Sequence, residues 1–368
     1  MANLRDGMNW APRAAKPQPV VAPGDFVFAA THFHPRPLYG QINGLREAGG
    51  QLKWIWDHDA ARLREVAEKF PEARCARSLD EILDDPGVAL VAAAAVPCDR
   101  QPLGLEVLRA GKDYFTDKSP FTTPDQLAEA RTVVAETGQK YLCYFSERLH
   151  NEASWHAGEL IAQGAIGRVL QVVILAPHNL AKATRPAWFF DKSRYGGILT
   201  DIGSHQFEQF LTYGSAEAER INFARVANFA NPDTPGLEDF GEASVTLRNG
   251  VSCYCRIDWF NPAGHRSWGD GRAFVLGTNG TLEIRKNNDL AREPQEGQVI
   301  YLVDDETEQR IPCEGRVGFP FFGEMILDCL QRTEKAMTQA HVFHAAELSM
   351  QAQAIADTEN SRCAQGVS

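Results

Sequence analysis

Asp201 and His205 are four residues apart in "YGGILTDIGSHQFEQF", at the start of an expected helix, so both side chains can lie on one helical face. A histidine with a carboxylate partner is suited to take a proton from a hydroxyl group. The alternative is an aspartate that only caps the helix and a partly buried structural histidine. The preceding Gly196 and Gly197 permit an unusual backbone and close approach of a ligand, which favours the chemical role.

Lys118, in "YFTDKSP", follows an expected strand at 113–116. At the carboxyl end of a parallel strand it would point into the ligand crevice and could orient a hydroxyl group, although a surface lysine is the alternative. Asp57 ends another expected strand, at 51–56. There it would accept hydrogen bonds from the ribose of a dinucleotide and repel a 2′-phosphate, which favours NAD over NADP; the alternative is a carboxylate that starts a helix.

The stretch "FVFAATHFHPRP", residues 26–37, lies where a dinucleotide-binding protein has its glycine-rich phosphate turn, yet it contains no glycine. Free backbone N–H groups at a helix N-terminus can hold phosphates without glycine. His32 and His34 could add side-chain hydrogen bonds, and their cationic forms would suit phosphate. A metal site needs three or four ligands, and no others lie nearby with a recognisable spacing, so we predict no bound metal.

The first half of the chain alternates between strand and helix. Short apolar strands at 25–30 and 51–56 are each followed by a stretch with helical spacing of apolar residues. The run "VALVAAAAV" at 88–96 has the nearly continuous apolar pattern of a strand buried on both faces. Later elements are expected at 113–116, 124–137 and 140–145. This alternation predicts an α/β fold with a doubly wound parallel sheet over roughly residues 25–146.

The second half is rich in strands from about residue 220 onward. Two pairs of strand-like runs flank Asn249-Gly250 and Asn279-Gly280, and Asn-Gly is a strong signal for a two-residue hairpin. We therefore expect an α+β region with a large, mostly antiparallel sheet and helices on one side of it, closed by carboxy-terminal helices.

The bulk composition limits the class of protein. A chain of 368 residues favours two domains, and a net charge of −11 argues against nucleic acid or an anionic membrane as a partner. No run is long enough to span a bilayer. Residues 1–24 are polar and lack a secretory signal, so they predict a flexible arm. The eight cysteines are scattered, as in a reduced cytoplasmic protein.

Several pieces of the chain resemble, in order and spacing over residues 25–360, the glucose–fructose oxidoreductase / inositol dehydrogenase (Gfo/Idh/MocA) family. "LGLEVLRAGKDYFTDKSPFTT" is similar to that family's segment around a Glu-Lys pair, with Asp117-Lys118 in its place. "RSLDEILDDPGVALVAAAAVP", "IGRV", "GGILTDIGSHQFE" and "GTNGTLEI" are further pieces of the resemblance.

The resemblance implies a Rossmann domain at 25–148 and a substrate-binding and oligomerisation domain at 149–368. It also implies NAD(P)-linked hydride transfer to or from a sugar, cyclitol or related polyol, and a homodimer or homotetramer formed through an open-faced sheet. The family's lysine, aspartate and general-base histidine correspond to Lys118, Asp201 and His205.

Further site residues are expected for each ligand. The cofactor residues are Thr31, His32, Phe33, His34, Asp57, Pro97, Asp117 and Lys118. The substrate residues are Arg148, His178, Arg185, Trp188, Tyr195 and Asp258, of kinds that line sugar sites or, for Arg148, match a family arginine.

The sequence departs from the family pattern at the phosphate turn, at Ser119 where the family has proline, and at "PCDRQP", which lacks the family's Asn-His. These departures affect the expected pose of the cofactor. Two alternatives stay open: a redox-neutral lyase, glycosidase or epimerase with tightly bound NAD, and a non-catalytic sensor of sugars or nucleotides. The set of Lys118, Asp201 and His205 argues against the sensor, which need not keep a proton-transfer group.

Overall fold

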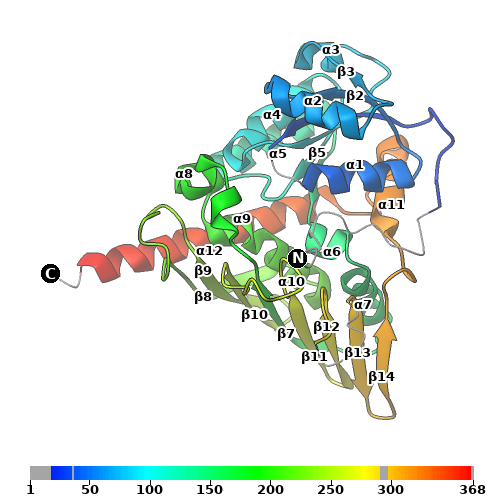
Figure 1. The fold of residues 1–368 in the computed structure, drawn as a ribbon. Helices are drawn as coiled ribbons and strands as arrows, with labels where there is room; N and C mark the ends of the chain where they lie inside the picture. Colours follow the sequence, from blue (N-terminus) through cyan, green and yellow to red (C-terminus); the bar gives the residue numbers. More distant parts are fainter. Residues whose placement is uncertain (1–17, 35–36, 291–296, 366–368) are drawn as a thin grey trace. The chain divides into compact units, whose positions relative to one another are not determined.

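The computed structural model describes residues 18–34, 37–290 and 297–365 (Figure 1). Most of the expected arm at 1–24 therefore lies outside the described residues. By residue contacts the chain forms two compact units. The amino-terminal unit contains the described part of Lys16–Tyr144 together with Phe319–Phe343, and the carboxy-terminal unit contains Phe145–Gly318 and the chain from His344 onward.

The amino-terminal unit is built on a six-stranded sheet of order β3-β2-β1-β4-β5-β6, in which every neighbouring pair is parallel. Its strands are β1 Val27–Phe33, β2 Gln51–Trp56, β3 Arg74–Cys75, β4 Leu90–Ala94, β5 Asp113–Asp117 and β6 Tyr141–Tyr144. Its helices are α1 Pro37–Glu47, α2 Ala60–Lys69, α3 Leu79–Leu83, α4 Pro97–Arg109, α5 Pro124–Thr137 and α11 Pro320–Gln331. The strand order is that of a doubly wound dinucleotide-binding fold, as predicted.

Local sequence accounts for these elements. All five residues of β4 are buried, as its continuous apolar run predicts. Thr123 caps α5 by accepting a hydrogen bond from the backbone N–H of Gln126, and Gly138 ends this helix with a φ of 65°. Helix α11, distant in sequence, lies beside α1 (Figure 1), and its Phe322 fills the space where Gly44 has no side chain.

The carboxy-terminal unit is built on an eight-stranded sheet of order β14-β13-β12-β11-β7-β10-β9-β8. Its strands are β7 Val169–Pro177, β8 Ala218–Ala227, β9 Phe240–Leu247, β10 Ser252–Asp258, β11 Arg272–Gly277, β12 Gly280–Arg285, β13 Val299–Asp304 and β14 Glu308–Pro312. Its helical segments are α6 Ser146–Leu149, α7 Glu152–Ala162, η1 Lys182–Thr184, η2 Ala187–Phe190, α8 Lys192–Tyr195, α9 Ile198–Asp201, α10 Gly203–Gly214 and most of α12 Gln339–Gln365.

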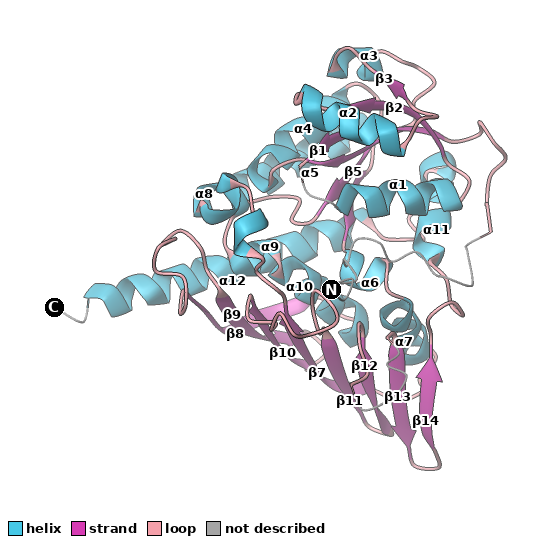
Figure 2. Ribbon diagram, viewed as in Figure 1, coloured by secondary structure: helices cyan, strands magenta, loops and turns pink. Residues whose placement is uncertain are grey.

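This sheet is antiparallel except where β10 runs parallel to β7. The hairpins expected at Asn249-Gly250 and Asn279-Gly280 join β9 to β10 and β11 to β12. Helices α7 and α10 pack on one face, as Figure 2 shows. Side chains alternate along the strands, so that Ala273 and Val275 of β11 are buried whereas Phe274 between them is exposed. The predicted fold class is confirmed.

Candidate functional site

Strand β1 runs beyond the expected 25–30, to Phe33, and contains a bulge at His32. Its pairing with β4 passes from Thr31–Ala93 to Phe33–Ala94 and so skips His32, whose φ is 56°. Glycine adopts this left-handed backbone readily, whereas other residues pay about 1–2 kcal/mol for it. At the end of β1, His32 therefore adopts a backbone conformation that glycine usually adopts.

Both histidines of this segment are neutral near pH 7. Burial lowers the pKa of His32 to about 4, although Asp57 opposes the shift. Burial and the nearby Arg62 also lower the pKa of His34. His34 stacks on His58 with ring centroids 5.1 Å apart. In the chain without a ligand, these histidines can therefore offer neutral N–H donors, and their contact with phosphate stays a prediction.

Asp57 lies at the end of β2, as predicted, and its carboxylate is almost fully buried. One oxygen accepts the backbone N–H of Phe33 at 2.7 Å, and the other accepts that of Asp59 at 2.8 Å. Arg62 lies within hydrogen-bonding distance of both oxygens, at 3.2 and 3.3 Å. Asp57 thus ties the end of β1 to the start of α2 and is charge-compensated by Arg62.

Arg100, which the sequence interpretation missed, holds the segment after β5. It is 1% exposed, and its guanidinium lies 3.2 Å from Asp117 Oδ2. It also donates to the carbonyl of Ser119 at 3.1 Å and to that of Lys118. A buried arginine in α4, the helix that begins at Pro97, therefore holds the backbone carbonyls of the predicted catalytic lysine and of the residue after it.

In the carboxy-terminal unit, Asp201 ends α9 and His205 lies in the first turn of α10, and both are buried. The glycine before α9 has a structural reason: Gly197 has a φ of 96°, and a Cβ there would come within 2.3 Å of the Gln353 carboxamide. Gln353 in turn accepts the backbone N–H of Leu199 at 2.9 Å. Gly197 thus allows close approach of Gln353 from α12.

The carboxylate of Glu147, in α6, contacts three polar side chains from three other segments. Its Oε2 accepts hydrogen bonds from Gln206 at 2.8 Å and from the Lys286 ammonium at 2.9 Å. Its Oε1 lies 3.3 Å from Nε2 of His178. Burial alone would raise the pKa of Glu147, but Lys286, His205 and His178 together hold it well below its usual value. The carboxylate is therefore ionised.

Lys286 connects this cluster to the helix that carries His205. Its side chain is 3% exposed, and its Nζ donates to Gln209 Oε1 at 2.7 Å. Gln209 Nε2 donates in turn to the backbone carbonyl of His205 at 2.8 Å. No motif signalled either Glu147 or Lys286, because they are 139 positions apart in the chain.

Arg148, predicted to contact substrate, forms a buried ion pair with Glu208 of α10, at 2.8 and 3.0 Å from its Nε to the two carboxylate oxygens. It also lies 5.5 Å from the ring of Trp155. These contacts give Arg148 a structural role between α6 and α10, and its substrate contact stays a prediction.

His178 and Arg185 share an aromatic cluster. The His178 ring centroid lies 4.4 Å from that of Trp268, and the guanidinium of Arg185 lies 4.5 Å from the ring of Phe189 and 5.1 Å from that of Trp259. Arg185 also donates to a backbone carbonyl at 2.8 Å. The structure thus brings two predicted substrate residues together, and adds two tryptophans that no spacing indicated.

The other predicted substrate residues have local partners. The Tyr195 hydroxyl donates to the Gly236 carbonyl at 3.1 Å and accepts the backbone N–H of Glu238 at 3.0 Å. Asp258 accepts the backbone N–H of Phe260 at 3.0 Å. Trp188 has a buried indole N–H that makes no hydrogen bond to the described residues.

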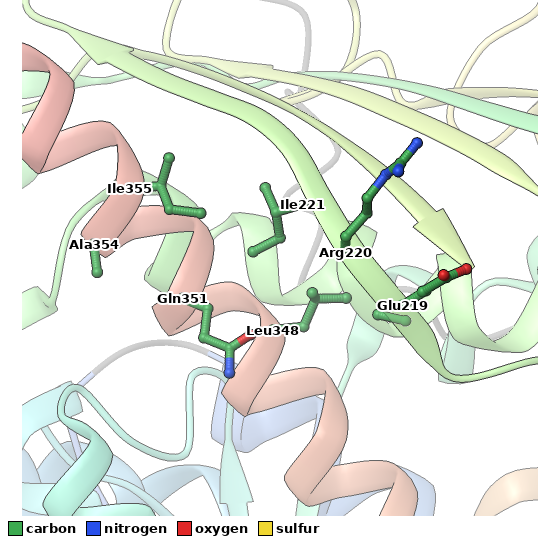
Figure 3. Close-up of a pocket in the computed structure, with 8 residues that line it drawn as sticks. Glu219, Arg220, Ile221, Leu348, Gln351, Ala354 and Ile355 are labelled. Atoms are coloured by element: carbon green, nitrogen blue, oxygen red, sulfur yellow. The ribbon is translucent and has the colours of Figure 1, made fainter. Parts of the chain in front are cut away.

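A groove of about 340 Å³ lies between β8 and α12 (Figure 3). Arg220, Ile221, Leu348 and Ile355 are among the residues that line it, and none of the predicted site residues does. Across residues 18–34, 37–290 and 297–365, no three His, Cys, Asp or Glu side chains are grouped to hold a metal ion. In the same part of the chain, no helix is long and apolar enough to cross a membrane.

Comparison with known proteins agrees with this fold. A model described as "Oxidoreductase family, NAD-binding Rossmann fold" (GFO/IDH/MocA) matches residues 29–145, and the model of the GFO/IDH/MocA C-terminal domain matches residues 155–283. A crystal structure of a protein from Erwinia carotovora atroseptica SCRI1043 classed as an oxidoreductase is 42% identical. It superposes with a TM-score of 0.87, over 90% of this chain and 99% of that one.

Two curated relatives are more distant. An uncharacterized oxidoreductase of Synechocystis sp. is 24% identical over 64% of this chain, and the D-xylose dehydrogenase of Paenarthrobacter nicotinovorans is 26% identical over 46% of it. The chain spans less than two thirds of their lengths, 64% and 47%. With both family models matched in order, and with a 42% identical structure covered almost completely, the chain belongs to the GFO/IDH/MocA family of oxidoreductases.

Proposed function

We propose that the protein transfers a hydride between a nicotinamide cofactor and a secondary alcohol of a sugar, cyclitol or related polyol, or the matching ketone. The observation that carries the proposal is the parallel sheet of order β3-β2-β1-β4-β5-β6, with His32 in a glycine-like conformation at the end of β1 and Asp57 at the end of β2. Dinucleotides bind outside the carboxyl ends of such strands.

The residues at these strand ends fit a dinucleotide. The left-handed backbone at His32 suits a chain that must pass close to phosphates. Of the backbone N–H groups between Thr31 and His34, that of Phe33 is already donated to Asp57. Asp57, whose two oxygens each accept a backbone N–H, would accept the adenosine ribose hydroxyls with its remaining lone pairs. Pro97, Asp117 and Lys118 would lie along the nicotinamide portion. A bound nicotinamide supplies the hydride acceptor or donor.

We propose that NAD is preferred to NADP. The carboxylate of Asp57 disfavours a 2′-phosphate by charge repulsion, since it is buried and held by two backbone N–H groups. Arg62, within 3.3 Å of this carboxylate, offsets part of that repulsion, so we expect NADP to bind more weakly than NAD but not to be excluded.

For the proton, His205 is the base that takes it from the alcohol, or the acid that returns it, with Asp201 supporting the imidazolium. Lys118 donates a hydrogen bond to the reacting oxygen and stabilises negative charge that develops on it. Arg100 keeps Lys118 in place by holding the carbonyls of Lys118 and Ser119.

For the substrate, we propose that the aromatic cluster of His178, Arg185, Trp259 and Trp268 recognises a polyhydroxylated ring. Aromatic faces can cover the apolar face of a sugar while polar groups bind its hydroxyls. Trp188 adds a buried indole N–H that a substrate hydroxyl could accept. Arg148, Tyr195 and Asp258 remain proposed substrate residues, and each of them also bonds to the protein.

We also propose a homodimer or homotetramer formed through the open face of the eight-stranded sheet. Phe223, Phe274, Leu276 and Val303 are 38% to 45% exposed, and each adjoins a residue of its strand whose side chain, on the opposite face, is buried. Exposed apolar side chains on a sheet face favour association. Charges of both signs lie on the same strands, such as Arg225 and Glu242, and could pair with the opposite charges of a second copy.

For the cell compartment, we propose the cytoplasm. The seven cysteines that the structure describes are all free thiols, as expected where glutathione keeps thiols reduced.

The activity is tested by following NADH absorbance while the purified protein is offered aldoses, inositols and their keto forms with NAD or NADP. We expect reversible, cofactor-dependent reduction or oxidation with at least one polyol, faster with NAD. Absence of turnover with the whole set, in both directions, would refute the proposed function.

A further inference from the structure

A buried ion pair in the carboxy-terminal unit takes no direct part in the proposed hydride and proton transfer. Glu147 and Lys286 lie 2.9 Å apart, with side chains 15% and 3% exposed. Removing two charges from water costs several kcal/mol per ion, and a buried pair often stabilises the fold less than apolar side chains of the same size. Such a pair is more readily explained by a role in a site than by stability.

Both members of the pair are connected by hydrogen bonds to the helix turn that carries His205. Glu147 accepts the side-chain amide of Gln206, the residue after His205. Lys286 donates to the side-chain amide of Gln209, which donates to the His205 backbone carbonyl. Both ions are thus linked to the first turn of α10 by hydrogen bonds of 2.7 to 2.8 Å.

We propose that Glu147 is a positioning residue that, with Lys286 as its counter-ion, fixes the first turn of α10 and sets the pH at which His205 exchanges its proton. The role in catalysis rests on the proposed function, in which His205 is the proton-transfer group. The role in titration does not depend on it.

The charges around His205 support this assignment. Glu147, Lys286 and His178 form one group, and Asp201 of α9 and the Arg148–Glu208 pair are the other charged groups on the adjoining α6, α9 and α10. Because His205 contributes to the low pKa of Glu147, the ionised carboxylate in turn favours protonated His205. Arg148 and Glu208 pair with each other, and Glu147 is the carboxylate whose charge is coupled to that of His205.

The test is an NMR titration of the His205 ring, assigned by its loss in His205→Asn, in the complete protein without ligand. In Glu147→Gln, which keeps the size and the bond from Gln206, we expect the pKa of His205 to fall by about one unit. In Glu147→Asp, which keeps the charge, the pKa of His205 should stay close to its value in the unaltered protein. Glu159→Gln, a carboxylate removed from α7 in the same unit, should leave it unchanged.

Lys286→Met provides an opposite test, which also serves if Glu147→Gln does not fold. Because it leaves the Glu147 charge uncompensated, we expect the pKa of His205 to rise. In active protein, Glu147→Gln should move the acidic limb of the kcat/KM profile to lower pH and leave the NAD dissociation constant unchanged.

The inference is overturned if folded Glu147→Gln has the same His205 pKa as the unchanged protein, or if Lys286→Met lowers that pKa. These titrations need no cofactor and no substrate. Shifted pKa values in a protein without turnover would thus support the Glu147 assignment while the proposed function failed, and unchanged values in an active enzyme would do the reverse.

Discussion

The backbone N–H of Phe33 donates a 2.7 Å hydrogen bond to the carboxylate of Asp57, and so joins the ends of the two strands that bind a dinucleotide in this kind of fold. The bond follows the bulge at His32. It holds the end of β1 in one conformation although this segment has none of the glycines that such a segment usually contains.

Exchanging His32 tests the bulge. In His32→Gly the left-handed backbone becomes unstrained, but the unfolded chain gains entropy, so we expect the free energy of unfolding to change by less than about 1 kcal/mol. His32→Val should destabilise by about 2 kcal/mol or more, because a β-branched residue is poorly tolerated at a φ of 56°. Urea unfolding measures both. Equal stability of the two variants would contradict the bulge.

Asp57→Asn tests cofactor choice. Loss of the charge should weaken NAD binding about tenfold and strengthen NADP binding, because the amide no longer repels a 2′-phosphate and leaves Arg62 uncompensated. Calorimetry with both nucleotides measures the change. Asp59→Asn is the matched control, since Asp59 is partly exposed and caps α2, and asparagine caps a helix about as well as aspartate; it should leave both the stability and the nucleotide preference nearly as they were.

Acid should destabilise the fold through two histidines. Burial lowers the pKa of His32 to about 4 and that of His150 to about 3, from the ordinary 6.5. Above pH 6.5 both histidines are neutral in the folded and the unfolded chain, and they do not reduce the free energy of unfolding. As the pH falls from 6.5 toward these lowered pKa values, the unfolded chain binds more protons than the folded chain, so the free energy of unfolding decreases. We expect the free energy of unfolding to drop by up to about 1.4 kcal/mol per pH unit for each group. Thermal unfolding between pH 7 and pH 4 should show a shallower decline in His32→Gln and His150→Gln, and an unchanged decline would refute the assignment.

His205→Asn should lower turnover by about 10²- to 10⁴-fold while circular dichroism and nucleotide affinity stay as in the unchanged protein. His156→Asn, at a partly exposed histidine of α7 paired with Glu159, is the control and should retain turnover. Near-normal turnover of His205→Asn would remove His205 from the mechanism.

Much of the fold could be predicted because its signals are local. The apolar run of β4, the hairpins at Asn249-Gly250 and Asn279-Gly280, and the capped helix α5 each depend on residues close in sequence. The parallel pairing of β10 with β7 could not be predicted in the same way, because it joins segments about 80 positions apart with no turn between them.

The site was predictable in part for the same reason. Asp57 and Lys118 could be placed from the ends of expected strands, and Asp201 and His205 from their spacing. The Glu147–Lys286 pair depends on tertiary packing between remote segments. The charge state of His32 could not be inferred either, because its low pKa results from burial that only the folded chain creates.

The most direct test of the central claim is a calorimetric titration of the unaltered protein with NAD, repeated with NADP. We predict one saturable site per chain for NAD and weaker binding of NADP, with NAD binding weakened in Asp57→Asn. Absence of binding by both nucleotides to the folded protein would contradict the account.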